Sequence, residues 1–399
     1  MTQRVPSIHL ATDFLRNIKR QADAALRPMG RRRKTSDYQG RRVVVAGMFS
    51  TASGLGEAAR QTYRVLSDHG LSPSAFDLAP IFNQSDLGAS QLPPPDSLCG
   101  TTIILHVNAP ETLPALRALG ARRWHDCRVI GYWAWELSVP PPSWLPIARH
   151  LDEVWTCSDF VRRSFQNHLT CPIRTVPIPI SPPAKLFARP EAFDHTPIRI
   201  LSMADGRSSF HRKNLLSSLR IYLAAFPDPA EATLTLKTRN LSRFPDYAAE
   251  LEATCQSRPD VRVIDESMTD ADRWDLLGSH QIVLSAHRAE GYGLHLAEAM
   301  SLGKLVVATG WSGNMQFMTP ENSVMLPFKL NKMQDPFGVY PNLEGAEWAE
   351  VDEAESAGLL RDAVQQSEQM QRLGAQARSD VANELDGTSI IDAVTDSTT

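Results

Sequence analysis

Residues 285–300 read Ser-Ala-His-Arg-Ala-Glu-Gly-Tyr-Gly-Leu-His-Leu-Ala-Glu-Ala-Met, and this stretch decides the predicted fold. It follows an apolar run at 281–284 that has the length of a buried strand. It then passes through Gly291 and Gly293 into a helical pattern that lasts to residue 302. A strand, a glycine turn and a helix in that order predict one βα unit of a parallel sheet.

The same alternation continues on both sides of this unit. Strand-like runs in the first half of the chain occupy residues 42–48, 101–107, 128–133, 153–156 and 173–178. Those in the second half occupy residues 198–203, 232–237, 261–264, 281–284 and 304–308. Helical patterns lie between most of these runs, as crossover helices do in parallel sheets. We therefore predict an α/β chain with two Rossmann-like domains that face each other across a cleft.

Chain length and proline content suggest where the domains divide. A chain of 399 residues exceeds the size at which one hydrophobic core stops growing, and residues 177–197 contain six prolines, which is typical of a linker. The predicted parts are an N-terminal arm at 1–41, a first domain at 42–185, a second domain at 186–370, and a closing helix with a polar tail at 371–399.

Composition excludes several classes of protein. The chain is 42% hydrophobic and 22% charged, and no apolar run approaches the ~20 residues that span a bilayer. The five cysteines are scattered without C-x-x-C spacing, which argues against a disulfide framework or a zinc site, and no signal peptide is evident. We expect a cytoplasmic protein.

The N-terminal arm is strongly basic although the whole chain carries a net charge of −4. Residues 1–42 hold eleven Lys or Arg against three Asp, and apolar residues recur at helical spacing between Leu10 and Leu26. This pattern is compatible with three structures: a solvated extension, a helix that docks on its own domain, or a helix that binds an anionic membrane surface. Nucleic acid is not expected, because no interleaved aromatic and basic residues recur elsewhere.

The stretch 285–300 also carries chemistry. Gly291 and Gly293 allow the backbone to approach a ligand closely, and the N–H groups and positive dipole end of the following helix suit a diphosphate. Glu290 precedes that helix and Glu298 lies inside it, so the two carboxylates can reach different ends of one ligand. Pairs of sugar or ribose hydroxyls are natural partners for a carboxylate.

Glu290 and Glu298, together with the strand and glycine turn at 304–317, resemble the retaining glycosyltransferases of the GT-B fold, the Glu-x7-Glu class that is similar to glycosyltransferase family 4. The resemblance covers about residues 42–330. It implies that Glu290 lies near the donor sugar and acts in catalysis, that Glu298 holds the ribose, and that the backbone of Gly291, Tyr292, Gly293 and Leu294 meets the phosphates.

A basic turn at 208–214 lies between the first strand and first helix of the second domain. A diphosphate leaving group needs cations, and Arg212 and Lys213 would supply them. The resemblance places an Arg and a Lys at this turn, and Arg207 is the alternative arginine. A lone basic turn without the neighbouring motif would be solvated surface.

Three short segments of the first domain lie at the ends of predicted strands and therefore face the same cleft. Gly54 and Gly56 begin a helix and could contact the diphosphate or the acceptor, although such turns are also common in structural loops. Aromatic faces suit sugar rings, and Glu136 could order an acceptor hydroxyl and act in catalysis. The acceptor-side set is His106, Asn108, Tyr132, Trp133 and Trp135. The alternative for the aromatic residues is a place in the core. Many members of the resembling class carry a His near residues 132–136, where this chain has none.

Asp270 and Asp272 spell the Asp-x-Asp metal signature of another glycosyltransferase fold, but helix capping after Thr269 explains them better. We expect no metal and no cofactor, since a nucleotide-sugar would be a substrate.

We predict a hexosyltransferase that moves a hexose, with a weak preference for mannose from GDP-mannose, to a saccharide or lipid-linked saccharide in cell-surface polysaccharide assembly. Two alternatives stay open. One is a nucleotide-sugar isomerase or sugar phosphorylase on the same fold, and the other is a non-catalytic carbohydrate-binding partner subunit.

Overall fold

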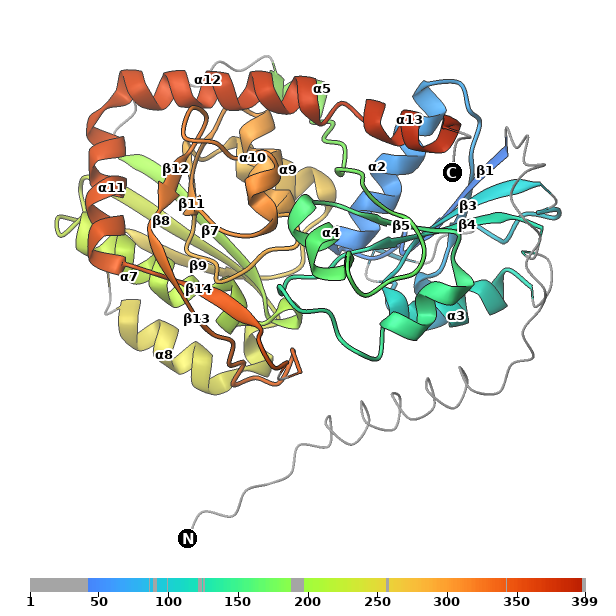
Figure 1. The fold of residues 1–399 in the computed structure, drawn as a ribbon. Coiled ribbons are helices and arrows are strands. Elements are labelled where there is room, and N and C mark those ends of the chain that lie inside the picture. The colour runs from blue at the N-terminus through green and yellow to red at the C-terminus, as the bar shows by residue number, and fades with distance from the viewer. Residues whose placement is uncertain are drawn as a thin grey trace, which may run out of the picture.

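A computed structural model of the chain describes residues 42–85, 87–88, 92–98, 100–120, 124, 126–187, 197–255, 258–341 and 343–396. It confirms the predicted α/β class, because two six-stranded sheets with helices around them make up two Rossmann-like domains (Figure 1). The predicted basic arm at 1–41 lies outside the described residues. Among the helices that the structure describes, none has the length and apolar character needed to cross a bilayer.

The first domain is built on a sheet whose neighbouring strands all run parallel. Its order is β2 (Ser74–Asp77), β1 (Arg42–Gly47), β3 (Thr101–His106), β4 (Arg128–Trp133), β5 (Glu153–Thr156) and β6 (Ile173–Thr175). The connections contain α2 (Gly54–Asp68), η2 (Ala79–Phe82), α3 (Ala109–Ala118), η3 (Leu145–His150) and α4 (Asp159–Phe165). Strands β3, β4 and β5 are buried along their whole length, because helices and loops cover both sheet faces.

The second domain repeats this plan. Its sheet runs β12 (Val324–Leu326), β11 (Leu305–Thr309), β10 (Ile282–Ser285), β7 (Ile198–Asp205), β8 (Ala232–Arg239) and β9 (Val261–Asp265). The connections hold η4 (Gly206–Ser208), α6 (Phe210–Lys213), α7 (Leu215–Ala225), η5 (Leu241–Arg243), α8 (Pro245–Cys255), α9 (Asp270–Gly278), α10 (Leu294–Ser301) and η6 (Gly313–Gln316). The chain order reverses between β7 and β10, which is where ligands bind in doubly wound sheets.

An antiparallel hairpin follows the second sheet and was not predicted from the sequence. Strand β13 (Phe328–Lys332) pairs with β14 (Glu347–Val351) in the register Phe328 to Val351. The side chains of β13 are largely exposed, so its sequence lacks the apolar run that marks a buried strand. In Figure 1 this hairpin lies in the lower part of the second domain, between its sheet and α8, with α12 at the opposite side.

The chain connects the two domains twice. The first connection includes α5 (Ala184–Phe187), within the proline-rich segment, and the second follows α11 (Glu353–Gln365) and the long helix α12 (Ser367–Glu384). Figure 1 shows α12 along one edge of the molecule and α13 (Thr388–Thr395) beside α2 of the first domain. The end of the chain predicted as a polar tail includes α13, whose Ile390 and Ala393 are buried, and Arg128 Nη2 donates to the Ala393 carbonyl at 3.3 Å.

Candidate active site

A cavity of about 600 Å³ lies between the two domains and is lined by both of them. It opens at the carboxyl ends of β1 and β3 in the first domain and of β7, β8 and β10 in the second. Each sheet changes its winding direction at this edge, between β1 and β3 and between β7 and β10. Loops diverge there, and the crevice that they leave is the usual ligand site of such folds.

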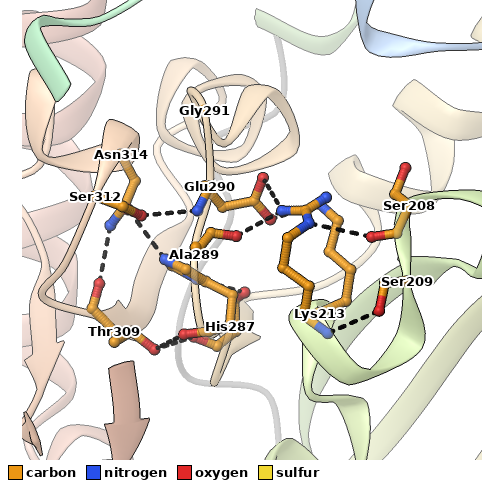
Figure 2. A network of polar contacts seen from close by, with 12 residues as sticks. Ser208, Ser209, Lys213, His287, Ala289, Glu290, Gly291, Thr309, Ser312 and Asn314 are labelled. Carbon is orange, nitrogen blue, oxygen red and sulfur yellow. Dashed lines mark hydrogen bonds and ion pairs between the residues drawn. The ribbon is translucent and has the colours of Figure 1, made fainter. Parts of the chain in front are cut away.

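The backbone of Glu290 is fixed by the loop that follows β11. Its N–H donates to Ser312 Oγ at 2.7 Å, and its carbonyl accepts from Gly313 N at 2.8 Å (Figure 2). Gly313 must be glycine here, since a Cβ at that position would lie 1.9 Å from the Gly291 carbonyl oxygen. The rigid loop therefore presents the Glu290 side chain to the cavity in one orientation.

The basic turn after β7 brings two cations to this carboxylate. Ser209 caps α6 by accepting from Arg212 N at 3.2 Å, and Lys213 Nζ lies 2.5 Å from Glu290 Oε1. Arg212 Nη1 donates to the Ala289 carbonyl at 2.5 Å and lies 3.2 Å from Glu290 Oε2. Arg212 is 2% exposed, so its guanidinium is held inside the protein at the wall of the cavity.

Burial and charge oppose each other at these groups. Burial acts to raise the pKa of Glu290, but Lys213 and Arg212 outweigh it and hold that pKa well below its ordinary value. Burial lowers the pKa of Lys213, although Glu290 counteracts this effect. The ionised carboxylate is thus stabilised by cations that a bound anion could share.

The glycine turn before α10 fits tightly between the domains. Gly293 has φ of +87°, a conformation that favours glycine, and it starts the helix. A Cβ on Gly291 would lie 2.9 Å from the Trp135 carbonyl oxygen of the first domain. The Gly291 carbonyl also accepts from Ser158 Oγ at 2.7 Å, and Tyr292 donates its hydroxyl hydrogen to the Ile178 carbonyl at 2.9 Å. These contacts fix the turn, and with it the start of α10, against the first domain.

Glu298 lies further along α10 and is 1% exposed. Arg273 of α9 forms an ion pair with its Oε2, and Glu57 of α2 lies close enough to affect both groups. Burial raises the pKa of Glu298 to about 7, Arg273 opposes that rise, and Glu57 adds to it. Two carboxylates from different domains therefore lie within electrostatic reach of Arg273 at this end of the cavity.

Most residues predicted for the site line the cavity. From the second domain these are Arg207, Arg212, Lys213, Glu290, Gly291, Tyr292, Gly293, Leu294 and Glu298. From the first domain they are Gly54, Asn108, Tyr132 and Glu136. Asn108 also holds the end of β4, because its Oδ1 accepts from Ala134 N at 2.9 Å. Burial raises the pKa of Tyr132, whose hydroxyl donates to the Val176 carbonyl at 2.6 Å.

Four predicted residues are not among the described residues that line the cavity: Gly56, His106, Trp133 and Trp135. Gly56 serves packing, since a Cβ there would lie 2.5 Å from the Thr51 carbonyl oxygen. His106, Trp133 and Trp135 were predicted on the acceptor side, but all three are buried in the core. His106 stacks on Tyr132 with ring centroids 4.5 Å apart, and burial lowers its pKa to about 3.

Trp133 and Trp135 belong to an aromatic cluster around Trp144. Trp133 lies 6.0 Å and Trp135 lies 5.0 Å from the Trp144 ring, measured between centroids. Trp133 is buried because it ends β4, an interior strand whose two faces are covered. Trp135 follows that strand and is buried against Trp144 and Tyr340. The aromatic faces of Trp133 and Trp135 are therefore occupied by protein side chains.

Several charged residues that were not predicted from the sequence also line the cavity. They are Glu57, Arg60, Lys237, Arg239, Arg273 and His295. Lys237 and Arg239 end strand β8, so their position at a strand carboxyl end was a signal that could have found them. Arg60 and Arg273 sit inside helices, where nothing in the local sequence distinguishes them from surface arginines.

Asp270 and Asp272 lie in the first turn of α9, where Thr269 Oγ1 accepts from Asp272 N at 3.2 Å. This confirms the capping interpretation of the Asp-x-Asp sequence. In the part of the chain that the structure describes, no group of three His, Cys, Asp or Glu side chains is arranged to hold a metal ion.

Two facing Rossmann-like domains with an inter-domain cleft define the GT-B architecture, and solved structures confirm this fold for the chain. HepE of Anabaena in complex with UDP-glucose matches with a TM-score of 0.61 at 13% identity, over 89% of this chain and 98% of HepE. A glycosyltransferase from Rickettsia africae matches with a TM-score of 0.57 at 14% identity, over 90% of this chain and 98% of that one.

A third structure, TarM, matches with a TM-score of 0.55 at 14% identity. The match covers 76% of this chain, which spans only 55% of TarM. No protein-family model matches the sequence, and no curated protein does so. The likeness therefore establishes the fold, and function must be argued from the site.

Proposed function

We propose that this chain is a hexosyltransferase that moves a hexose from a nucleoside diphosphate sugar to a saccharide hydroxyl. The observation that carries the proposal is the placement of Arg212 and Lys213 against Glu290 at the cavity wall, at the reversal point between β7 and β10. Buried cations beside the start of a helix provide the charge that a diphosphate requires. The neighbours solved with UDP or UDP-glucose support the same ligand class.

The second domain would hold the donor. Arg212, Lys213 and the amides at the start of α10 would bind the diphosphate, and Glu298 would accept hydrogen bonds from the ribose. Glu290 would lie at the donor sugar, with its charge fixed by the two cations. Because these groups are already oriented, they would stabilise the negative charge that grows on the leaving diphosphate without reorganising.

In the reaction, the bond between the anomeric carbon and the diphosphate oxygen breaks, and a bond to the acceptor oxygen forms. The acceptor proton passes to the departing diphosphate. We propose retention of the anomeric configuration, with departure and attack on one face of the sugar. Glu136, which lines the first-domain side of the cavity, would order the acceptor hydroxyl.

The neighbours favour UDP as the first nucleotide to test, since HepE was solved with UDP-glucose and the pneumococcal transferase GtfA with UDP and GlcNAc. GDP-mannose, the donor preferred from the sequence, has no support among them and is an alternative. A role in cell-surface polysaccharide assembly, with the basic residues 1–41 on an anionic membrane surface, belongs to the same proposal.

The direct test is a binding panel of UDP-, GDP-, ADP- and dTDP-sugars by isothermal titration calorimetry, followed by transfer assays with the donor that binds. Lys213→Met should weaken binding of that donor by roughly tenfold or more, because a charge-assisted contact to phosphate is lost. Binding of none of the four nucleotides would overturn the proposal. Release of an isomer without acceptor, or of a sugar phosphate with inorganic phosphate, would favour the isomerase or phosphorylase instead. Binding without any turnover would favour a non-catalytic partner subunit.

A further inference from the structure

The connection between β13 and β14 packs against the basic turn of the donor side. Its first part, residues 333–340, is called the tip segment below. Asp335 fixes this segment by accepting a hydrogen bond from the backbone N–H of Tyr340 at 3.0 Å. Asp335 Oδ1 also accepts from Ser209 Oγ at 3.1 Å. Since Ser209 caps the helix that carries Arg212, the tip segment is attached to the basic turn.

Aromatic packing holds the tip segment against the same turn. Phe337 packs edge-on against Phe244 and Tyr247, with ring centroids 5.3 Å and 5.9 Å apart. Phe210 contacts the same two rings, at 5.3 Å and 4.8 Å, and is fully buried at the start of α6. The tip segment and the helix that carries Arg212 therefore pack on one aromatic cluster.

Tyr340 ends the tip segment beside Arg212. The guanidinium carbon of Arg212 lies over the Tyr340 ring, 5.8 Å from its centre, which is within the range of a cation–π contact. The same ring packs edge-on against Trp135 of the first domain, with centroids 5.6 Å apart. Tyr340 is 8% exposed and is not among the described residues that line the cavity. Its ring therefore acts on a ligand only through a neighbour, and Arg212 is a neighbour that lines the cavity.

Carbonyl oxygens of the second domain accept hydrogen bonds from the Arg212 guanidinium. Nε donates to the Ser208 carbonyl at 3.1 Å, and Nη1 donates to the Ala289 carbonyl at 2.5 Å. The Tyr340 ring lies beside this guanidinium, and the negative face of an aromatic ring attracts a positive charge. The ring thus adds a packing contact that restricts a long and otherwise flexible side chain.

We propose that Tyr340 is a positioning residue for the donor diphosphate: its ring holds the Arg212 guanidinium where it meets the diphosphate and joins that cation to Trp135 of the first domain. Tyr340 acts through Arg212 and contributes no group of its own to the ligand. The Trp135 carbonyl also abuts Gly291, where a Cβ would lie 2.9 Å away, so one first-domain residue supports both the cation and the turn before α10. This inference rests on the proposed function.

Tyr340→Leu removes the ring and keeps an apolar side chain, whereas Tyr340→Phe keeps the ring. Two probes separate the ends of a nucleotide, because inorganic pyrophosphate has no ribose or base and uridine has no phosphate. We expect Tyr340→Leu to weaken the binding of pyrophosphate and of UDP roughly tenfold in calorimetry, as for the loss of a desolvated cation–π contact. Uridine affinity, measured by NMR titration, should stay within about threefold of wild type because uridine offers Arg212 no phosphate. Tyr340→Phe should restore the wild-type affinity for pyrophosphate.

Phe226→Leu is the matched control. Arg361 lies over the Phe226 ring, 5.9 Å from its centre, and neither residue is among the described residues that line the cavity. Phe226 is 1% exposed, so this change also removes a buried ring beside an arginine. It should reproduce any general loss of stability, measured by thermal unfolding, and leave pyrophosphate affinity unchanged. Wild-type pyrophosphate affinity in Tyr340→Leu, or an equal loss of affinity for uridine and pyrophosphate, would overturn the positioning role.

Asp335→Ala is a second test that applies even where Tyr340→Leu does not fold. It removes the hydrogen bonds that attach the tip segment to Ser209 and hold the Tyr340 backbone, and it leaves the ring and Arg212 in the chain. We expect weaker binding of pyrophosphate and unchanged binding of uridine, in the same pattern as for Tyr340→Leu. Unchanged binding of both probes would contradict the inference.

Arg212→Met and the double variant complete the test. If Tyr340 acts through Arg212, the two changes are non-additive, and Tyr340→Leu has little further effect on pyrophosphate affinity once Arg212 is replaced. Additive losses would contradict the inference while leaving the proposed function intact. A wild-type protein that binds none of the four nucleotide-sugars would instead remove the proposed function, and this inference with it.

Discussion

Lys213 Nζ lies 2.5 Å from Oε1 of Glu290, although the two residues are 77 positions apart in the chain. They meet because β7 and β10 are neighbours in the sheet and their carboxyl ends face the same cleft. Arg212 Nη1 lies 3.2 Å from the other carboxylate oxygen, Oε2 of Glu290. Lys213 and Arg212 therefore place two positive charges at the cavity wall, where a diphosphate could bind them.

Glu290→Gln should separate binding from catalysis. Removing the carboxylate leaves Arg212 and Lys213 without their shared counter-charge, so UDP should bind about tenfold more tightly. Transfer should fall by roughly a hundredfold or more, because a fixed charge at the reacting sugar is lost. Calorimetry with UDP and a transfer assay check both parts.

The control for this variant is Glu350→Gln. Glu350 also pairs with an arginine, Arg288, at 2.7 and 2.8 Å, but it is not among the described residues that line the cavity. It should change neither UDP affinity nor transfer. Weaker UDP binding by Glu290→Gln would contradict the assignment of the two cations to the phosphates.

Glu298 should make stability depend on pH. Burial raises its pKa to about 7, above the ordinary value of 4.5. Between these two pH values the folded chain therefore retains a proton that the unfolded chain releases. The stability contributed by this group is therefore present at low pH and is lost as the pH rises through about 7, by roughly 3 kcal/mol. Wild type should lose that amount relative to Glu298→Gln between pH 4.5 and pH 7.5, as measured by urea unfolding. A difference that does not vary with pH would contradict the prediction.

Gly291→Ala should destabilise the contact between the domains. Its Cβ would lie 2.9 Å from the Trp135 carbonyl oxygen, and backbone cannot move aside cheaply, so we expect a loss of about 1–3 kcal/mol and weaker transfer. Gly358→Ala is the matched change inside α11, where a Cβ meets nothing within 4 Å, and it should stabilise by about 0.5–1 kcal/mol. Thermal unfolding of both variants measures these changes in stability, and equal changes in the two variants would refute the steric argument.

Arg239→Met should loosen domain closure. Arg239 Nη2 donates to the Ala52 carbonyl of the first domain at 2.7 Å, while Asp205 holds the guanidinium through Nε at 2.8 Å. Loss of this contact should increase the radius of gyration in small-angle scattering and lower kcat/KM for the donor by about tenfold. Arg243→Met, at an exposed arginine nearby, should do neither. An unchanged scattering curve with normal activity would show that the contact does not govern closure.

Transfer should not require a divalent metal ion. Arg212 and Lys213 supply positive charge where a metal would otherwise neutralise the leaving diphosphate. We therefore expect the same rate of transfer after dialysis against EDTA as before it. Activity that disappears on chelation and returns with Mg²⁺ or Mn²⁺ would show the expectation to be wrong.

Much of the fold and part of the site could be predicted from local sequence. The central strands β3, β4, β10 and β11 are buried along their whole length because both sheet faces are covered there, so apolar sequence runs mark them. Glu290, Arg212 and Lys213 could be placed at one cleft because each directly follows a strand of a parallel sheet. Hairpin β13–β14 and helix α13 were missed, since β13 is largely exposed and α13 is only eight residues long.

Local sequence predicts the alternation of strands and helices, the glycine turn before α10 and the residue types at the strand ends, because these features depend on neighbours a few residues apart. Tertiary packing, by contrast, buries Trp133 and Trp135 in the core, pairs Arg273 with Glu298, and places Tyr340 against Trp135. Each of these depends on which segments meet across a sheet or between domains. Burial and partnership are properties of that packing, and local patterns do not encode them.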